Sequence, residues 1–522
     1  MGKGFQFTPE TIPPPDAETR AMLREGQTLG VFQIESPGMR GLLRRLRADD
    51  FATVTAASSV IRPGPSDSGM RRRFVRRMTG KEPPVHLDPR MEETLRETRG
   101  VMVHQEDVMR VAQRVAGMPL GRADVLRRSM TKKRSAEAMA AVREEFIGGA
   151  IAHGTVPEVA REIWSQLKSF AGYAFCKAHS ASYTVVSLRS AWLKAHFPAT
   201  FLAAVITNGG GFYSRAAYVS EARRLGIRLL LPCVNRSQAE WTGDEGESAI
   251  RAGLAAVEGL TTATLDRLLE TRRRGGPFVS LRDFLERTGA GQAETERLVR
   301  AGAMDELGME NEEWRMEKEE FSILHSSFQW SGSSTPGPNS SPFSIPPTAR
   351  ALRPRLLWAV EEHFRSGEIM HGQCSLFAPP PEEIPPLPAL TDREVWEMET
   401  RALGGLALRA HPLAWWRDEI ARVRGRVDSV DLTRWGGRRV ALVGWKVAHR
   451  RTRTCRGEQM LFLTLEDEAG LFEAILFPPA YRRFGHLAIG PGPFAVRGRV
   501  EVEDGYPTLN ASDLQALNPT TQ

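Results

Sequence analysis

The chain has 522 residues, with 70 lysines and arginines against 63 aspartates and glutamates, a formal net charge of +7 and a pI of about 9.4. This length allows several domains, because single hydrophobic cores seldom grow beyond about 250–300 residues. The basic balance favours a polyanionic partner. No apolar run approaches the ~20 residues that span a bilayer, which excludes a transmembrane protein.

The N-terminal segment and the cysteines indicate a reducing compartment. Residues 1–20 lack the apolar core of a secretory signal. The four cysteines are far apart in sequence and form no CxxC pair, which speaks against a zinc or disulfide framework. We therefore expect a cytoplasmic protein that does not associate with membranes.

The first three fifths of the chain are expected to be mostly helical. Within residues 20–310, apolar residues recur at helical spacing, for example in 135–149 and 157–167. Residues 325–347 are rich in Ser, Pro and Gly and predict a flexible linker. A second Pro-rich segment covers 378–388.

The pattern changes from about residue 440 to short runs of alternating hydrophobicity, which predict β-strands. Turn residues follow at 467–470 and 503–505. Together they predict a small antiparallel barrel. The expected fold class is therefore multidomain, with a mostly α-helical part followed by a small all-β barrel.

A basic helix is expected at residues 123–133, ADVLRRSMTKK. Ala123, Leu126 and Met130 recur at helical spacing and form its apolar face. The remaining surface carries four cations that can grip phosphates through charge-assisted hydrogen bonds. They are Arg127, Arg128, Lys132 and Lys133. The alternative is a solvated basic face, which the charge pattern alone favours slightly.

A second candidate lies in residues 170–194, FAGYAFCKAHSASYTVVSLRSAWLK. Lys177 and His179 come just before a helix that we expect Ser180 or Ser182 to cap, leaving N–H groups that favour an anion. Lys177 would be a point charge for phosphate, and His179 a hydrogen-bond donor or a wall of the site. The alternative for His179 is a satisfied interior histidine.

Five blocks of the chain closely resemble the bacterial family-C DNA polymerases, which comprise the alpha subunits of DNA polymerase III and their error-prone translesion relatives. In order they are GVFQIES (30–36), RPGP (62–65), HQEDVM (104–109), LGRADVLRRSMTKK (120–133) and FAGYAFCKAHSASY (170–183). The resemblance runs from about residue 12 to the end, interrupted only by the linker. Which branch of the family the chain represents stays open.

The resemblance implies that these blocks form the fingers, which close on the incoming nucleotide. Arg127 and Arg128 would then contact the triphosphate or the nearby template–primer. Lys177 and His179 would line the nucleotide pocket. Lys132 and Lys133 would contact DNA.

The carboxylates needed for nucleotidyl transfer are not evident. The family uses palm aspartates that hold two Mg²⁺ ions, and these precede the GVFQIES block. Here only residues 1–29 precede it, and no Asp-x-Asp occurs in the chain. The nearest acidic cluster, at 466–468, is expected in a solvated hairpin turn. The resemblance therefore implies the C-terminal half of a polymerase, with no catalytic or metal-binding residue, Mg²⁺ ligands on a palm not present in this chain, and no activity alone.

Residues 254–270 resemble a helix-hairpin-helix element, which meets the DNA backbone through hairpin amides. Only Gly259 of the usual glycine pair is present, with threonines at 261–262 near the second position. The alternative is a purely structural helical hairpin. Arg272 and Arg273 follow and can add phosphate contacts, which would make binding strongly salt-dependent.

A short motif, QCSLF at residues 373–377, resembles the peptide that docks into the bacterial sliding clamp. Leu376 and Phe377 would fill a pocket, and Gln373 would form a hydrogen bond at its rim.

The C-terminal barrel resembles an OB-fold, which binds single-stranded template in this family. Trp445, Phe462 and Phe472 can stack on bases, or they can fill the barrel core, which we favour for Phe462. The better candidates for DNA contact are the arginines of the following loop, which can track phosphates. They are Arg450, Arg451 and Arg453.

The resemblance implies five regions. In order, they are a remnant of the palm–fingers junction (1–35), fingers (36–220), a helix-hairpin-helix region (221–310), a flexible linker with the clamp motif (311–395), and a linker helix with the OB-fold (396–522).

The implied function is the C-terminal portion of a polymerase III alpha-type subunit. It would bind dNTP, template–primer and single-stranded DNA and the sliding clamp in replication or translesion repair, together with a palm-bearing chain. The alternative is a non-catalytic DNA- and clamp-binding accessory protein. Primer extension by the chain alone and with a palm-bearing chain separates the two.

Overall fold

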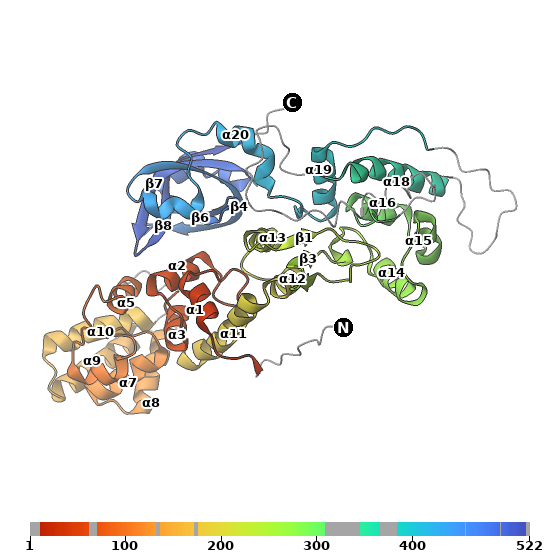
Figure 1. The fold of residues 1–522 in the computed structure, drawn as a ribbon. Helices are drawn as coiled ribbons and strands as arrows, with labels where there is room; N and C mark the ends of the chain where they lie inside the picture. The colour runs from red at the N-terminus through yellow and green to blue at the C-terminus, as the bar shows by residue number, and fades with distance from the viewer. Residues whose placement is uncertain are drawn as a thin grey trace. The chain divides into compact units, whose positions relative to one another are not determined.

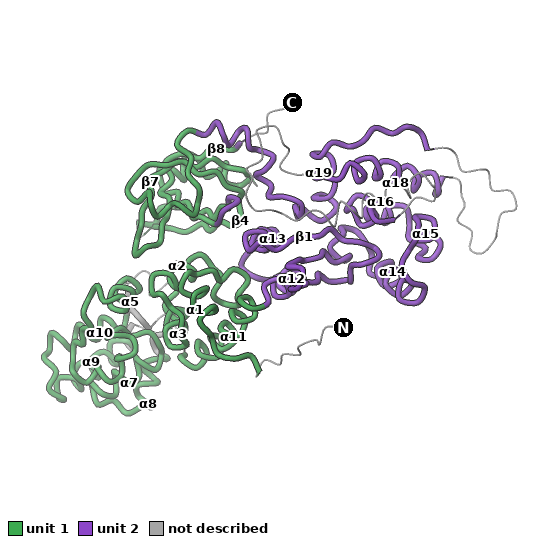
Figure 2. The backbone as a smooth tube through the Cα atoms, viewed as in Figure 1, with its two compact units in different colours: residues 1–196, 424–466, 471–516 green, residues 197–423, 467–470, 517–522 purple. Residues whose placement is uncertain are grey.

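The computed structural model describes residues 11–61, 70–131, 136–171, 176–307, 345–365, 384–454, 456–490 and 492–517 (Figure 1). The chain divides into two compact units, shown in separate colours in Figure 2. Unit 1 combines residues 1–196 with 424–466 and 471–516, and unit 2 comprises residues 197–423, 467–470 and 517–522. Among the described helices, none has both the length and the apolar character needed to cross a membrane.

Unit 1 begins with short helices whose starts are set by capping side chains. Ser36 Oγ accepts a hydrogen bond from the N–H of Met39, and Asp50 Oδ1 accepts one from the N–H of Thr53. The elements are α1 (Ala17–Arg24), α2 (Pro37–Leu46), α3 (Phe51–Val60), α5 (Met70–Met78), η2 (Pro89–Met91) and α6 (Glu92–Leu95).

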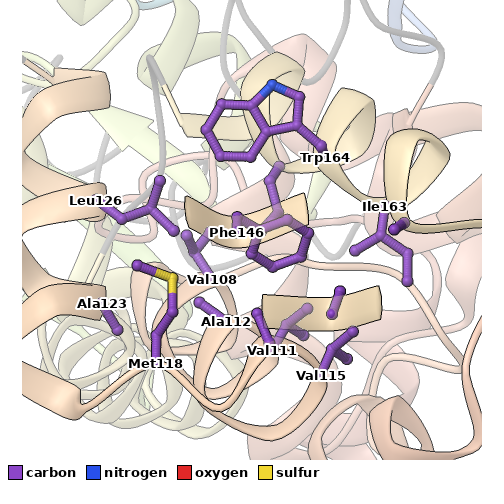
Figure 3. Packing of buried hydrophobic residues seen from close by; sticks show 14 of the residues in the cluster. Val108, Val111, Ala112, Val115, Met118, Ala123, Leu126, Phe146, Ile163 and Trp164 are labelled. Carbon is purple, nitrogen blue, oxygen red and sulfur yellow. The ribbon is translucent and has the colours of Figure 1, made fainter. Parts of the chain in front are cut away.

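Five longer helices follow, and four of them share one apolar core. The elements are α7 (Gln105–Ala116), α8 (Leu120–Thr131), α9 (Ala136–Ala152), α10 (Pro157–Ala171) and α11 (Lys177–His196). Figure 3 shows the core, to which α7 contributes Val108 and Val111, α8 Leu126, and α9 and α10 the Phe146–Trp164 ring pair. The helices predicted at 123–133, 135–149 and 157–167 are confirmed within the described residues, as α8 up to Thr131, α9 from Ala136 and α10, because their apolar spacing matches this shared core.

Helix α11 packs on α3 through buried hydroxyls. Ser59 Oγ donates to Ser180 Oγ at 2.7 Å, and Thr55 Oγ1 lies 3.1 Å from Thr184 Oγ1. The predicted N-cap of α11 was wrong, because the helix begins at Lys177 and both predicted serines lie inside it. The packing on α3 uses the Ser180 side chain, which is buried and not available as a cap.

The C-terminal part of unit 1 is a closed barrel with the strand order β4-β5-β6-β8-β7. The strands are β4 (Arg439–Arg453), β5 (Gln459–Glu466), β6 (Leu471–Leu476), β7 (Phe494–Glu503) and β8 (Tyr506–Ala516). Around them lie η5 (Ser429–Trp435), α21 (Pro478–Phe484) and η6 (Leu487–Ile489). Leu463, Phe472 and Leu509 are among the side chains that fill the barrel. The predicted barrel and both turns are confirmed.

Two details of the barrel differ from the expectation. The β6–β8 pair is parallel, while the other pairs are antiparallel, and this arrangement is consistent with an OB-fold. The acidic turn after β5 is not fully solvated, since Glu466 and Asp467 are buried. Asp467 Oδ1 accepts hydrogen bonds from the N–H groups of Ala469 and Gly470, and so the carboxylate holds the turn together.

Unit 2 contains a small sheet that the sequence pattern did not predict. Its strands are β1 (Arg228–Leu230), β2 (Thr242–Asp244) and β3 (Ala249–Arg251), in the order β1-β3-β2. Three residues per strand are too few to produce a recognisable alternation. The helices of this unit are α12 (Pro198–Asn208), α13 (Arg215–Arg224), η3 (Leu254–Ala256), α14 (Thr262–Gly275), α15 (Leu281–Thr288), α16 (Gln292–Arg300), α18 (Pro347–Arg365), α19 (Asp392–Ala402), η4 (Pro412–Trp416) and α20 (Arg417–Ala421).

A buried arginine joins three segments of unit 2 that are distant in sequence. Arg353 of α18 is 0% exposed; its Nε and Nη2 donate to Asp305, at 2.8 and 2.6 Å, and Nη2 also donates to Glu399 of α19 at 2.7 Å. Arg409 Nε donates to the same Glu399 carboxylate at 2.9 Å. Burial disfavours the charged form of Arg353 and would lower its pKa. The ion pairs and hydrogen bonds with Asp305 and Glu399 have the larger effect and raise the pKa of the guanidinium above its ordinary value.

Candidate nucleic-acid interface

Three helices of unit 1 meet at the start of α7. Arg127 of α8 donates from Nη1 to Oε1 of Gln105 at 3.0 Å. The adjacent Glu106 accepts a hydrogen bond at 2.9 Å from the backbone N–H of Lys177, the first residue of α11. The side chain of Arg127 and the backbone of Lys177, 50 residues apart in sequence, therefore contact adjacent residues of α7.

The start of α7 is itself firmly held. Asp107 Oδ2 accepts hydrogen bonds from the N–H groups of Val103 and His104, both at 2.8 Å, and so ties the entering chain to the first turn. His104 is buried, and Val108 enters the core shown in Figure 3. This part of the HQEDVM block is therefore a fixed platform for the cations around it.

Each cation at this platform is paired with a carboxylate. Asp124 forms ion pairs with Arg127 and Arg128, at 2.8 and 2.7 Å, and Lys177 Nζ lies 2.6 Å from Glu97. The hydrogen bond from Arg127 holds the pKa of Asp124 below its usual range. Pairs of this exposure contribute little to stability, typically about 0–1 kcal/mol. An anion with more charge than a carboxylate can therefore take their place.

His179 lies at the same end of α11 and is half-buried. Its ring centroid is 4.2 Å from that of Tyr183, one helical turn further along. Tyr183 is in turn 5.3 Å from Phe32, in an edge-on arrangement. The sequence predicted a role for His179 but gave no sign that Phe32, in a different block, would lie beside it.

Several predicted residues fall outside the part of the chain that the structure describes. They are the DNA-contact candidates Lys132 and Lys133, and the clamp-motif residues Gln373, Leu376 and Phe377.

The hairpin before α14 lies against α16 of the same unit. Gly259 has a φ of +78°, a conformation that favours glycine because residues with a Cβ rarely adopt it, and the Arg297 guanidinium lies beside it. The N–H of Thr261, the N-cap of α14, donates to Oε1 of Glu294 at 2.9 Å. Burial opposes the ionisation of Glu294, but hydrogen bonds led by the Thr261 hydroxyl outweigh it and lower its pKa. The Glu294 carboxylate thus accepts the hydrogen bond of a hairpin N–H group that the sequence predicted to contact a DNA phosphate. No sequence motif indicated this contact.

The two arginines predicted to follow this hairpin have different surroundings. Arg272 Nη1 donates to the carbonyls of Val234 and Ser237, both at 2.8 Å, and so connects α14 to the loop after β1. Arg273 is exposed and pairs with Glu270 at 2.8 Å.

The predicted barrel arginines lie on a two-stranded ribbon formed by β4 and β5, and not in a loop as the sequence predicted. Arg450, Arg451 and Arg453 are exposed on the last part of β4, which pairs with β5 after its pairing with β7 has ended. An open groove of about 570 Å³ separates this ribbon from α21. Its lining includes Arg451, Gln459, Tyr481, Arg482 and His486. Phe472 is in the barrel core, whereas Trp445 and Phe462 are half-buried.

The described residues do not supply a metal centre. Within residues 11–517, apart from the gaps given above, no group of three or more His, Cys, Asp or Glu side chains could hold a metal ion.

Comparison with known proteins identifies relatives over nearly the whole chain. Residues 1–154 match the model of the bacterial DNA polymerase III alpha subunit finger domain, and residues 226–314 match that of the helix-hairpin-helix motif. The chain is 33% identical over 98% of its length to an error-prone DNA polymerase of Symbiobacterium thermophilum, of which it covers 47%.

Two relatives named DNA polymerase III subunit alpha give a similar result. The DNA polymerase III subunit alpha of Aquifex aeolicus is 31% identical over 91% of this chain, and that of Escherichia coli strain K12 is 32% identical over 94%. The chain covers 37% and 40% of these two relatives. It therefore spans less than half the length of the curated relatives it matches.

Proposed function

Because the chain is a member of the family that includes bacterial DNA polymerase III alpha subunits and error-prone DNA polymerases, we propose that it binds a deoxynucleoside triphosphate and DNA for template-directed DNA synthesis. The synthesis would serve replication or translesion repair. Residues 36–220 would act as fingers, residues 221–310 as a DNA-backbone contact, and the barrel as a contact for single-stranded template.

The nucleotide part of this proposal is carried by the contacts at the start of α7, where the Arg127 side chain binds Gln105 and the backbone of Lys177 binds Glu106. A triphosphate needs several cations at one place, and these two come from different helices that Gln105 and Glu106 hold together. Arg128, 65% exposed on its side chain, can reach toward the same ligand. Guanidinium groups suit phosphate because they donate two parallel hydrogen bonds.

In this proposal, the triphosphate replaces the carboxylates that are now paired with these cations. Asp124 forms ion pairs with two arginines, as two oxygens of one phosphate would. Glu97 forms an ion pair with Lys177. Binding of a triphosphate would exchange weak, exposed pairs for charge-assisted hydrogen bonds of about 1.5–3 kcal/mol each.

Removing the three ribbon arginines is expected to reduce the salt dependence of single-stranded DNA binding. Each phosphate contact on a single strand contributes about 0.7 to the slope of log K against log salt. The Arg450→Ala/Arg451→Ala/Arg453→Ala variant should therefore lower the steepness of that slope by about 2. Fluorescence anisotropy with a labelled oligonucleotide over a series of NaCl concentrations measures it.

A charge-matched variant controls for net charge. Arg424, Arg426 and Arg434 are exposed and precede the barrel strands. Their triple alanine variant loses the same charge and should keep the slope of the wild-type chain. An equal reduction in both variants would show that the ribbon has no specific role.

The clamp motif gives a second binding prediction. We propose that Phe377 fills a pocket of the sliding clamp together with Leu376. Phe377→Ala should abolish capture of the clamp in a pull-down, whereas Phe343→Ala, a phenylalanine in the Pro- and Ser-rich segment, should not. Unchanged capture by the Phe377→Ala variant would exclude the motif as the docking peptide.

Mg²⁺ enters the proposal only through the family reaction, in which it neutralises charge on the triphosphate and the reacting oxygens. The described residues do not fit a site for it, since they contain no suitable cluster of ligands. We propose palm aspartates, on a palm-bearing chain or segment, as its ligands. The residues named here bind and orient the nucleotide and the DNA.

A further inference from the structure

Helix α5 carries five arginines and no acidic residue in nine positions, MRRRFVRRM. Its apolar side chains are buried, since Phe74 is 0% and Val75 is 2% exposed, and Phe74 packs in a small core with Val60 of α3. Residues three or four positions apart share one face of a helix, so the arginines opposite this core lie on the outer face. The helix is therefore anchored on one side and strongly cationic on the other.

Three of the five arginines are engaged within the chain. Arg77 Nη1 donates to the carbonyl of Gly100 at 3.0 Å and so connects α5 to the segment before α7. Arg76 lies 3.5 Å from Glu82. Arg71 is half-buried, and burial lowers the pKa of its guanidinium. These contacts fix the position of the helix without using its two remaining arginines.

Arg72 and Arg73 carry positive charge that the chain does not compensate. Both are exposed, and no carboxylate of the described residues pairs with either of them. Each has another arginine one turn further along, at positions 76 and 77, and like charges at this spacing destabilise a helix. An anion from outside the chain would relieve this repulsion. The outer face of α5 is therefore suited to a polyanion.

The barrel lies next to α5 within unit 1. Lys81, three residues after the helix, forms an ion pair with Asp504 in the turn between β7 and β8. Burial raises the pKa of Glu473 on β6, and the positive charges of Arg71 and Arg450 both oppose this rise. Because such an effect is strong only at short range, α5 and the ribbon that carries Arg450 lie near the same carboxylate.

From this arrangement we infer that α5 binds the phosphate backbone of single-stranded DNA through Arg72 and Arg73, and so extends the strand contact of the ribbon onto the fingers. The inference rests on the proposed function, in which the ribbon binds single-stranded DNA. The neighbouring ribbon is the reason to assign a single strand to α5. Contacts of this kind position the strand, carry no sequence information and depend strongly on salt.

The test is the salt dependence of single-strand binding at two lengths. Arg72→Ala/Arg73→Ala removes two phosphate contacts of about 0.7 each and should lower the steepness of log K against log salt by about 1.4 for oligo(dT) of about 30 nucleotides. Between about 50 and 200 mM NaCl, the wild-type chain should then lose about sevenfold more affinity than the variant. An oligo(dT) of about 8 nucleotides, within the range that one OB-fold covers, should show no change. Fluorescence anisotropy measures both.

Two further variants serve as controls. Arg72→Lys/Arg73→Lys keeps both charges and should keep the wild-type slope. Arg143→Ala/Arg161→Ala removes the same charge from exposed positions of α9 and α10 and should also keep it. The thermal unfolding midpoint of the alanine variant at α5 should not fall, because both side chains are exposed and the change removes like-charge repulsion.

The outcomes separate this inference from the proposed function. If the alanine variant at α5 keeps the wild-type slope for the long oligonucleotide, or matches the Arg143→Ala/Arg161→Ala variant, α5 is not a DNA contact. If both lengths are affected equally, or if only binding of a blunt duplex changes, the extension of a single strand onto α5 is overturned. If the ribbon variant keeps the wild-type slope, the proposed barrel contact fails, whereas a reduced slope for the α5 variant still supports the α5 contact.

Discussion

Replacing Arg353 by methionine is expected to lower the free energy of unfolding of unit 2 by about 3–5 kcal/mol. The guanidinium is fully buried and is the shared partner of Asp305 and Glu399. Its removal leaves two buried or half-buried carboxylates without that compensation. Arg409 stays beside them, at 2.9 Å from Glu399 but at 4.0 Å from Asp305, and so compensates Asp305 weakly. Urea unfolding followed by tryptophan fluorescence measures the change, since Trp396 of α19 is close to this network in sequence.

Arg350 provides the control for this prediction. It lies on the same helix, one turn earlier, and forms a longer ion pair of 3.4 Å with Asp392. Its side chain is about one third exposed, and Arg350→Met should therefore cost less than about 1 kcal/mol. Equal destabilisation by both variants would show that the buried network does not hold α18 to α19.

Removing both central cations of the nucleotide site is expected to weaken dATP binding about a hundredfold or more. Arg127 and Lys177 each offer charge-assisted hydrogen bonds worth about 1.5–3 kcal/mol, and about 2.7 kcal/mol already corresponds to a hundredfold change. The Arg127→Ala/Lys177→Ala variant should keep its fold, because both side chains are partly exposed and their ion pairs lie at the surface, although Arg127 also gives up its hydrogen bond to Gln105. Equilibrium dialysis with labelled dATP measures the affinity.

A second double variant separates position from charge. Arg114 pairs with Glu93 near the other end of α7, and Lys168 is exposed on α10. Arg114→Ala/Lys168→Ala loses the same charge and should bind dATP within about twofold of the wild-type chain, since surface charges at a distance are largely screened. If the two double variants lose affinity equally, the start of α7 is not the binding site.

Local patterns predicted the elements that repeat regularly. The helices α9 and α10 and the barrel strands were evident because a buried face imposes a spacing that can be read from one sequence. The small sheet of unit 2 was missed because its strands are only three residues long. The start of α11 was placed too late, because Ser180 looked like a cap but packs on α3.

Contacts between distant residues could not be predicted from spacing. Phe32 and Tyr183 come from blocks that the sequence suggested separately, and only the fold places their rings together. The sequence singled out neither Glu294 nor Arg353, which lies in the segment 311–395 expected to be a linker. In the structure, Glu294 accepts a hydrogen bond from the N–H of Thr261, and Arg353 is completely buried.

Saturable binding of dATP to the wild-type chain tests the central claim most directly. Equilibrium dialysis should show one bound nucleotide per chain, with an affinity that falls as NaCl rises and that tripolyphosphate competes away, because the phosphates supply most of the attraction. The Arg127→Ala/Lys177→Ala variant should lose this binding at the same concentrations. Absence of saturable binding, or equal binding by wild-type and variant chains, would contradict the nucleotide site at the start of α7.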